Sequence, residues 1–134
     1  MNFIKGVGID ITKIPRFTRL INQKYFQNFL NKALHPKEIE EFHRLKTIEL
    51  QSKYLASRWS YKEALVKATG NKKIIFSKVY LKKNEQGKPF IAFENDYVEE
   101  HKDINDISNK THVSISHEDD TSIAIVIIER NNNI

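Results

Sequence analysis

The sequence predicts an α+β fold in which a mostly antiparallel sheet packs against one long central helix. Segments rich in β-branched residues lie near both ends of the chain, as is typical of strands. Two pairs of strand-like segments are joined by short turn sequences, NEQGK at 84–88 and EDDT at 118–121, which favours antiparallel hairpins. The longest helical pattern, at 50–69, occupies the middle of the chain.

The chain of 134 residues is expected to form a single domain, 1–134, because it can bury one core but not two. It has no cysteine, which excludes disulfides, thiolate zinc sites and a cysteine nucleophile. No apolar run approaches the roughly 20 residues of a membrane span, and the start of the chain lacks the apolar core of a signal peptide. We therefore expect a soluble, cytoplasmic protein with no membrane partner.

Each element has its own signal. A first strand is expected at 4–12, where β-branched residues surround two glycines, and short helices follow at 14–22 and 24–34. The segment 35–45 has Pro36 near its start and acidic residues in its first turn, so we interpret it as an ordinary surface helix. Four further strands are expected at 78–83, 89–93, 112–117 and 122–128, and one short helix at 94–101.

The central helix is apolar on two sides. At about 100° per residue, its two apolar stripes consist of Leu50, Tyr54, Tyr61, Leu65 and Ala68, and of Leu55, Trp59 and Val66. A helix of this kind is substantially buried, so it should form the centre of the fold. Gly70 and Asn71 are a usual signal for the end of such a helix.

Charge is unevenly distributed along the chain. Residues 1–90 carry 19 Lys and Arg against 7 Asp and Glu, whereas residues 91–134 carry 3 against 10. A basic front portion suggests an anionic partner such as nucleic acid, phosphate groups or an acidic protein, although a Lys-rich solvated surface explains it equally well. Arg16 and Arg19 lie about one turn apart, either as a basic patch for an acidic partner or as a solvated helix edge.

Asp10 is the only acidic residue among the first 37, and it lies in an apolar strand close to two glycines. Two interpretations stay open. In one, the strand alternates, Asp10 faces water and the glycines mark a bulge. In the other, a metal ion holds the carboxylate, and the glycines let the backbone approach a bulky anionic ligand.

Glu63 lies on the central helix, away from the main apolar stripe and beside the small residues Ala56 and Ser60. It could pair with Lys67 at i,i+4 on a solvated face, which is worth a few tenths of a kcal/mol. It could also bind a ligand. Two carboxylates, water and phosphate oxygens are what a hard, octahedral magnesium ion prefers, so Asp10 and Glu63 are candidate ligands of one Mg²⁺.

The histidines and the standard catalytic and binding motifs give less information about function. His112 and His117 flank a strand and should point to opposite faces, so they do not suit one metal ion together. His112 shares its face with Ser114 and Ser116, a polar stripe that either lines a pocket or is the wet face of a strand. The sequence has no nucleophile elbow, phosphate-binding glycine loop or RNA-recognition motif. It therefore gives no support to a hydrolase triad, a P-loop or a nucleic-acid partner.

Three blocks occur together in a fixed order: GVGIDITKIPRF at 6–17, RWSYKEALVKATG at 58–70 and HVSISHEDDTSIAIVII at 112–128. Together they resemble the holo-[acyl-carrier-protein] synthase family of phosphopantetheinyl transferases, and the GKP turn at 87–89 agrees. The resemblance covers essentially the whole chain and implies the 4'-phosphopantetheinyl transferase-like fold. It also implies Mg-dependent transfer of 4'-phosphopantetheine from coenzyme A to a serine of apo-acyl carrier protein, with release of adenosine 3',5'-bisphosphate.

The same resemblance implies roles for individual residues. Asp10 and Glu63 would hold Mg²⁺ and would act in catalysis with Lys67. The residues expected to bind or border coenzyme A, the co-substrate, are Arg58, Lys62, Lys67 and His112.

The resemblance also implies macromolecular partners. Arg16 would belong to a basic first helix that docks the acidic recognition helix of the acyl carrier protein, with Arg19 as a helper. The short members of the family form homotrimers with active sites at subunit interfaces, so a homotrimer is expected here. The base for the serine proton could be Glu63 or a metal-bound water. The alternative function is a non-catalytic basic module that binds RNA or coenzyme A, in which the paired carboxylates have no role.

Overall fold

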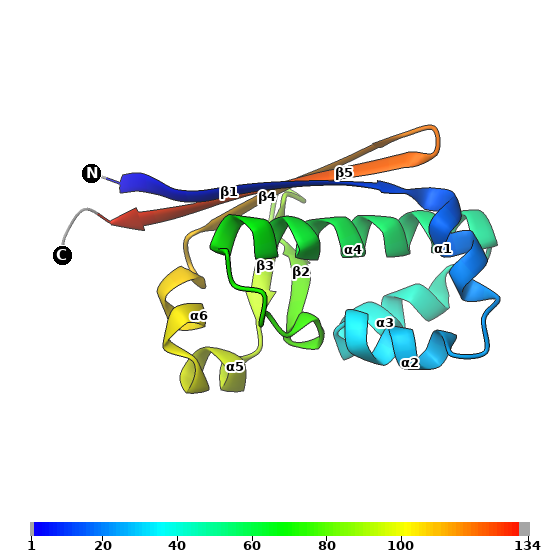
Figure 1. The fold of residues 1–134 in the computed structure, drawn as a ribbon, viewed down its shortest axis with the longest axis horizontal. Helices are drawn as coiled ribbons and strands as arrows, with labels where there is room; N and C mark the ends of the chain where they lie inside the picture. The colour runs from blue at the N-terminus through cyan, green and yellow to red at the C-terminus, as the bar shows by residue number, and fades with distance from the viewer. Residues whose placement is uncertain (1, 132–134) are drawn as a thin grey trace.

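The computed structural model describes residues 2–131, and one long helix, α4, runs through its middle (Figure 1). The strands are β1 (Asn2–Lys13), β2 (Val79–Lys83), β3 (Pro89–Phe93), β4 (Thr111–Glu118) and β5 (Thr121–Asn131). The helices are α1 (Ile14–Ile21), α2 (Phe26–Ala33), α3 (Pro36–Arg44), α4 (Ile48–Thr69), α5 (Asn95–Glu100) and α6 (Lys102–Ile107), with a 3₁₀ turn, η1 (Phe76–Lys78).

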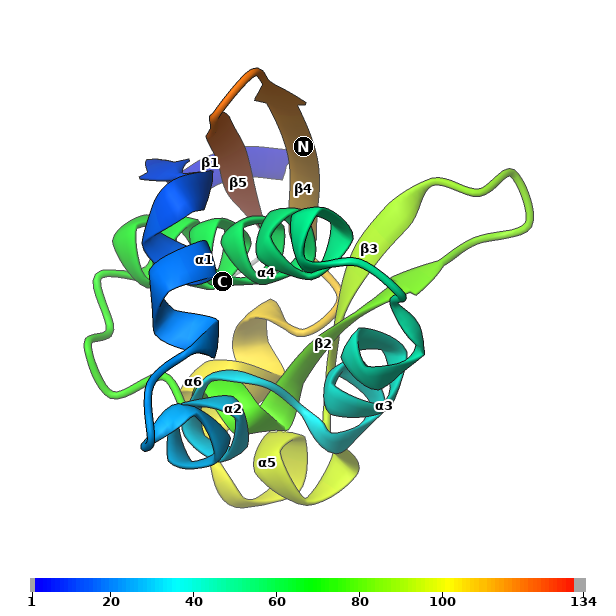
Figure 2. The ribbon, with the colours of Figure 1, turned by 90° about the vertical axis from the view of Figure 1, so that its right-hand side faces the viewer.

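The sheets are antiparallel, which confirms the predicted α+β class. One has three strands in the order β1-β5-β4 and lies along α4, and the other is the β2–β3 hairpin. Figure 2 shows the tip of this hairpin standing away from the rest of the chain. Helices α1, α2 and α3 gather at one end of α4, and α5 and α6 at the other (Figure 1). Within residues 2–131, no helix combines the length and hydropathy that crossing a bilayer requires.

The central helix is buried on two sides, as predicted, except at Leu50 of the first predicted stripe, which is 49% exposed. Its second half packs under the three-stranded sheet through Tyr61, Ala64 and Leu65, against Ala124 and Val126 of β5 among others. Its first half packs against α1, α2 and α3 in a second cluster that includes Phe17, Leu30, Leu34, Phe42, Leu55 and Ala56. Because α4 takes part in both clusters, it fixes the positions of both ends of the molecule.

The ends of α4 follow from capping. The Oγ1 atom of Thr47 accepts a hydrogen bond from Leu50 N at 3.2 Å, so the helix starts before the predicted residue 50. Gly70 ends it in the left-handed conformation, with φ of 71°, as the sequence predicted. Helix α6 was not predicted, because six residues carry too short a periodic signal, yet Ile104 is almost fully buried.

Strand β1 touches the backbone of α4. A Cβ atom on Gly8 would lie 1.9 Å from Ala64 O, and one on Gly6 would lie 1.9 Å from Ala68 O. No side chain fits at either position. The expectation that these glycines admit a ligand is therefore wrong: they admit the central helix. A register shift between Ile4 and Gly6 supplies the bulge that the other interpretation expected.

The face of the three-stranded sheet opposite α4 is apolar and exposed. On β1, the exposed fractions of Val7, Ile9 and Ile11 are 53%, 54% and 69%. Their partners across the sheet are Ile127, Ile125 and Ile123 of β5, followed by His112, Ser114 and Ser116 of β4. We call these nine residues the outer face. A monomeric soluble protein rarely exposes so continuous an apolar surface.

Helix α3 is more than the ordinary surface helix predicted for 35–45. Glu38 in its first turn is fully buried, although Glu40 and Glu41 are exposed. Glu38 also completes a capping box, because its Oε1 atom accepts from His35 N at 3.1 Å while His35 Nδ1 accepts from Lys37 N. The prediction is wrong at Glu38, since a carboxylate can be buried where it meets a buried cation.

Candidate active site

The contact between β1 and α4 brings Asp10 to Lys67. Lys67 Nζ lies 3.1 Å from Asp10 Oδ1 and also donates to Ile9 O at 2.9 Å. Thr12 Oγ1 donates to Asp10 Oδ2 at 2.9 Å. The Asp10 side chain is only 15% exposed, whereas Lys67 is 53% exposed. Asp10 therefore faces the helix rather than open water, and its negative charge is matched by an ammonium group from α4.

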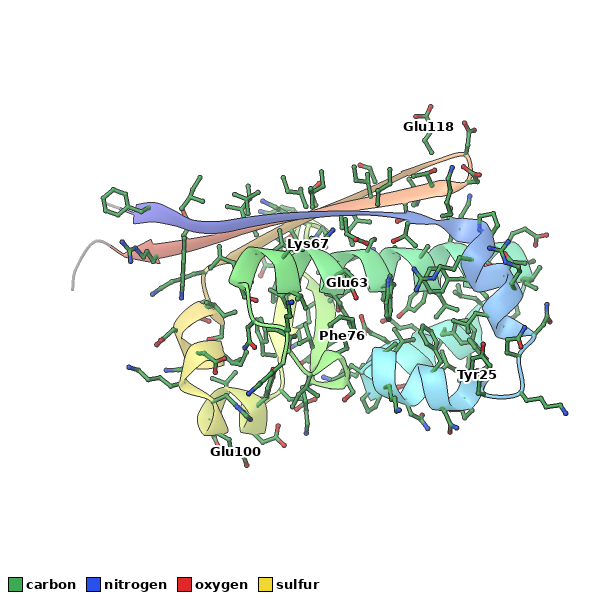
Figure 3. All side chains as sticks on the ribbon, viewed as in Figure 1. Tyr25, Glu63, Lys67, Phe76, Glu100 and Glu118 are labelled. Carbon is green, nitrogen blue, oxygen red and sulfur yellow. The ribbon has the colours of Figure 1, made fainter. Side chains whose placement is uncertain are left out.

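Glu63 precedes Lys67 by one turn of α4 and is half-buried. Residues four apart lie on the same flank of a helix, so Glu63 is on the flank that faces Asp10. Figure 3 labels both residues on α4, with Lys67 on the side toward the sheet. Lys67 turns to β1 instead of forming the alternative i,i+4 pair with Glu63. The structure thus brings Lys67 to Asp10, and Glu63 lies one turn earlier on the same helix.

The two carboxylates suit a magnesium ion by their chemistry. Asp10 Oδ1 already accepts a hydrogen bond from the Lys67 ammonium, so the Asp10 carboxylate stabilises a positive charge beside it. Among residues 2–131 there is no cluster of three or more His, Asp or Glu side chains able to hold a metal. Magnesium bound by Asp10 and Glu63 would need further oxygens from water and substrate, as is usual for this ion.

Lys62 is not near these residues. Its ammonium is fully buried and donates to Glu38 Oε1 at 2.5 Å, Ala33 O at 2.9 Å and Phe76 O at 2.9 Å. Three acceptors satisfy its three protons. The expected position of Lys62 beside the coenzyme A phosphates is thus corrected by the structure, because the ammonium is enclosed between α2, α3 and η1. Burial lowers the pKa of Lys62 to about 8, while Glu38 acts to raise it, so the group is still charged at neutral pH.

Glu38 is the buried acceptor for Lys62, and the sequence did not reveal it. Besides Lys62, its carboxylate accepts from the Tyr61 hydroxyl at 2.9 Å. Burial raises the pKa of Tyr61 well above its usual value, and Glu38 adds to the shift, so this hydroxyl stays protonated. The available signal was Lys62 itself, since a lysine on a helix that is buried on two sides requires a buried acceptor.

Arg58 lies on the other side of α4 from Glu63. The two are five residues apart, which at about 100° per residue places them on different flanks. The Arg58 guanidinium stacks on the Tyr54 ring, with Cζ 4.0 Å from the centroid, and Nη1 donates to Ser57 Oγ at 3.0 Å. The side chain is 18% exposed. In one chain the structure therefore does not bring Arg58 to Asp10.

His112 also lies away from Asp10. It is exposed on the outer face, where its Nε2 is 2.9 Å from Glu129 Oε2. With Lys88 and Pro89 it lines an open hollow of about 410 Å³ beside the β2–β3 hairpin. Within this chain, β5 stands between His112 on β4 and Asp10 on β1.

Arg16 and Arg19 are both exposed on α1. The guanidinium of Arg16 lies over two rings, 5.4 Å from the centroid of Phe17 and 5.2 Å from that of Trp59. This stacking holds a positive charge at the molecular surface. The structure therefore leaves both arginines accessible to a large partner.

Comparisons with known proteins identify the family. A family model described as the 4'-phosphopantetheinyl transferase superfamily matches residues 6–126. The chain is 40% identical over 128 residues to a holo-[acyl-carrier-protein] synthase of Wolbachia pipientis subsp. Culex pipiens (strain wPip), covering 93% of this chain and 97% of that protein. It is 35% identical over 132 residues to one of Clostridium novyi (strain NT), covering 97% and 91%.

Solved structures agree with these relatives. A holo-[acyl-carrier-protein] synthase from Neisseria meningitidis superposes with a TM-score of 0.76 at 31% identity, covering 94% of this chain and 98% of that chain. One from Bacillus anthracis str. Ames, in complex with CoA (3',5'-ADP), superposes with a TM-score of 0.74 at 25% identity, covering 96% and 98%.

The fold and the matched residues thus define a transferase, and the chain belongs to the 4'-phosphopantetheinyl transferase superfamily. The relatives and structures named above are holo-[acyl-carrier-protein] synthases, which confirms the resemblance seen in the sequence. An enzyme of this family is not the non-catalytic basic module considered as the alternative.

Lys62 and Lys67 of α4 should differ in how much they contribute to stability. Lys62→Met should lower the free energy of unfolding by about 3–5 kcal/mol, because it removes the close cationic partner of the buried Glu38 carboxylate and leaves only Arg58, 3.8 Å away. Lys67→Met should lower it by no more than about 1 kcal/mol, because its ion pair is half exposed. Urea denaturation measures both. Equal losses for the two variants would show that the Glu38 pair does not hold α3 to α4.

Proposed function

We propose that this enzyme transfers 4'-phosphopantetheine from coenzyme A to a serine of an acyl carrier protein and releases adenosine 3',5'-bisphosphate. The observation that carries the proposal is the ion pair of Asp10 with Lys67 at the junction of β1 and α4, with Glu63 one turn before Lys67 on the same helix. Carboxylates and an ammonium suit the pyrophosphate of coenzyme A, and the named relatives are holo-[acyl-carrier-protein] synthases. The proposal places the reaction in the cytoplasm, since a chain without cysteine suits a reducing compartment.

The proposed reaction exchanges one P–O bond for another. The serine oxygen bonds to the phosphorus that carries pantetheine, and the bond from this phosphorus to the bridging oxygen breaks. The electron pair leaves with that oxygen on adenosine 3',5'-bisphosphate. The serine proton passes to Glu63 or to a water beside it. Atoms and charge balance without a further reactant.

The residues of the chain have distinct parts in this reaction. Lys67 would offset the negative charge that builds on the leaving phosphate, and its hydrogen bond to Asp10 keeps the ammonium in place. Thr12 orients Asp10 from the other side. Magnesium, when held by Asp10 and Glu63, supplies Lewis-acid polarisation of the phosphoryl oxygens.

Glu63→Gln should abolish transfer while the fold is retained, because an amide neither takes the serine proton nor binds magnesium well. We expect a loss of at least about 100-fold. The measurement is mass spectrometry of an apo-acyl carrier protein incubated with coenzyme A, magnesium and enzyme, in which one phosphopantetheine is added. Glu40→Gln, on the exposed side of α3, is the matched control and should transfer normally. A wild-type enzyme that adds no mass would overturn the function; full activity of Glu63→Gln would overturn the role of this residue.

Arg16 and Arg19 are proposed to dock the acyl carrier protein. Both are exposed on α1, which starts directly after the strand that carries Asp10. A bound acidic protein would therefore lie close to the catalytic residues. The partly exposed Trp59 ring beneath Arg16 would add contact area next to its charge.

Salt should weaken this docking more than it weakens the chemistry of bound substrate, since exposed charges are screened. Arg16→Ala should raise the KM for the carrier protein by about tenfold and leave the KM for coenzyme A unchanged. Arg44→Ala, an exposed arginine on α3, is the matched control. Salt-independent KM values for the carrier protein would remove Arg16 and Arg19 from this role.

A homotrimer with shared active sites is also proposed, because the expected residues lie at two edges of the sheet. Asp10, Glu63 and Lys67 are at the β1 edge, and we call them the first half-site. His112 lies on β4, the other edge strand, and Arg58 lies on the far flank of α4; we call these two the second half-site. Contact between the β1 edge of one copy and the β4 edge of the next would join the two. Such head-to-tail contacts close into a ring, which would also cover the outer face.

Mixing inactive variants tests the shared site. Light scattering should give the mass of three chains for the wild type. Glu63→Gln trimers and Arg58→Ala trimers should each be inactive at low coenzyme A, but subunits mixed after reversible dissociation should regain about a quarter of wild-type activity, because one site in four then contains both intact half-sites. A monomeric wild type, or no recovery from mixed trimers of proven composition, would contradict the proposal.

A further inference from the structure

Two cations lie beside one buried carboxylate where α3 meets α4. Lys62 and Arg58 share one carboxylate, that of Glu38, and the side chains of Lys62 and Glu38 are each only 1% exposed. Lys62 makes the short contact, whereas Arg58 Nε lies 3.8 Å from Glu38 Oε2. Within residues 2–131, Arg58 Nε is buried and has no hydrogen-bond partner. An unbalanced cation of this kind is costly unless an anion completes it.

Tyr54 determines where this cation lies. It precedes Arg58 by one turn of α4, and its ring stacks on the guanidinium at 4.0 Å. The ring is itself fixed, because its hydroxyl is 3.0 Å from both Glu38 O and Glu41 Oε1 and can donate to either. Burial raises the pKa of Tyr54, so the hydroxyl remains a neutral donor. Phe42 packs against the same ring, with centroids 6.4 Å apart.

This stacking matters because a free arginine side chain has many rotamers, and binding an anion orders it at a cost in conformational entropy. A guanidinium already held on an aromatic ring loses less freedom on binding. The guanidinium of Arg58 does not form a close pair with Glu38, because the Glu38 carboxylate already accepts hydrogen bonds from Lys62 and Tyr61. Nε is buried and Nη1 already donates to Ser57, so the Nη2 end of the guanidinium is the part that an anion from outside the chain would meet.

We propose that Tyr54 is a positioning residue: its ring holds the Arg58 guanidinium in the orientation that binds a phosphate of coenzyme A, without touching the substrate itself. The proposal rests on the proposed function, in which Arg58 belongs to the second half-site. The face of the Tyr54 ring affects the affinity for coenzyme A, because it holds Arg58. The Tyr54 hydroxyl stabilises the fold, because it donates to Glu38 O or Glu41 Oε1 of α3.

A set of variants separates these two parts of Tyr54. Tyr54→Leu should raise the KM for coenzyme A by about three- to tenfold, the factor that a cation–π contact is worth, with kcat changed less than about twofold. Tyr54→Phe keeps the ring and should restore the wild-type KM. Phe26→Leu is the matched control, since it removes a ring from the same apolar cluster that packs on Phe29 and Phe42 rather than on Tyr54, and should lower only the free energy of unfolding. Tyr54→Met replaces the leucine variant if that variant does not fold.

The decisive measurement is the same change in an Arg58→Ala background. There, Tyr54→Leu should produce no further rise in the KM or in the Kd for coenzyme A measured by calorimetry, because the two residues act through one contact. An equal rise in both backgrounds, or a rise that Tyr54→Phe shares with Tyr54→Leu, would overturn the positioning role while transfer by the wild type continued. A wild type that neither binds coenzyme A nor transfers would overturn the role and the proposed function together.

Discussion

The close contact between β1 and α4 is the constraint on which the rest of the structure depends. Because Gly6 and Gly8 have no side chain, strand β1 can lie directly against the backbone carbonyl groups of α4. On the helix, the residues opposite these glycines are also small: Ala64 lies against Gly8 and Ala68 against Gly6. A larger residue at any of these positions would separate the two elements, and the ammonium of a lysine on α4 would no longer reach the strand. The candidate site is therefore a direct result of backbone packing.

A second contact fixes the other side of the helix. The buried pair of Glu38 and Lys62 ties α2, α3 and η1 to α4 through hydrogen bonds to Ala33 and Phe76. A buried ion pair is weak support for stability in itself, because desolvation offsets much of the attraction, but breaking one partner is costly. The pair thus specifies how the short helices sit rather than adding much net free energy. Two lysines on one helix consequently differ in kind: Lys62 organises the fold, and Lys67 remains at the surface.

The sequence predicted the features that depend on local patterns. Turn residues and alternating apolar residues marked the strands, and a long two-sided periodicity marked α4. Helix α6 has too few residues for a period, and the burial of Glu38 depends on how α3 packs, which the charge of the residue alone argues against. For the candidate site, chemistry suggested two carboxylates for magnesium, and family resemblance supplied their roles. Neither could separate Lys62 from Lys67, because that difference depends on which side of α4 meets α3.

One arrangement would account for three features that a single chain leaves incomplete. The outer face is exposed and is apolar along β1 and β5, the three-stranded sheet of residues 2–131 ends at β1 and β4, and within the same residues Arg58 Nε has no hydrogen-bond partner. Coenzyme A is long and carries phosphates at separated positions, so it suits a site divided between two edges. In the proposed ring, the same association would bury the apolar face, join the edges and bring the anion to the arginine. Glu63 and Arg58 lie on different flanks of α4 in each chain. Assembly of several chains is the simplest way for both residues to act on one substrate molecule.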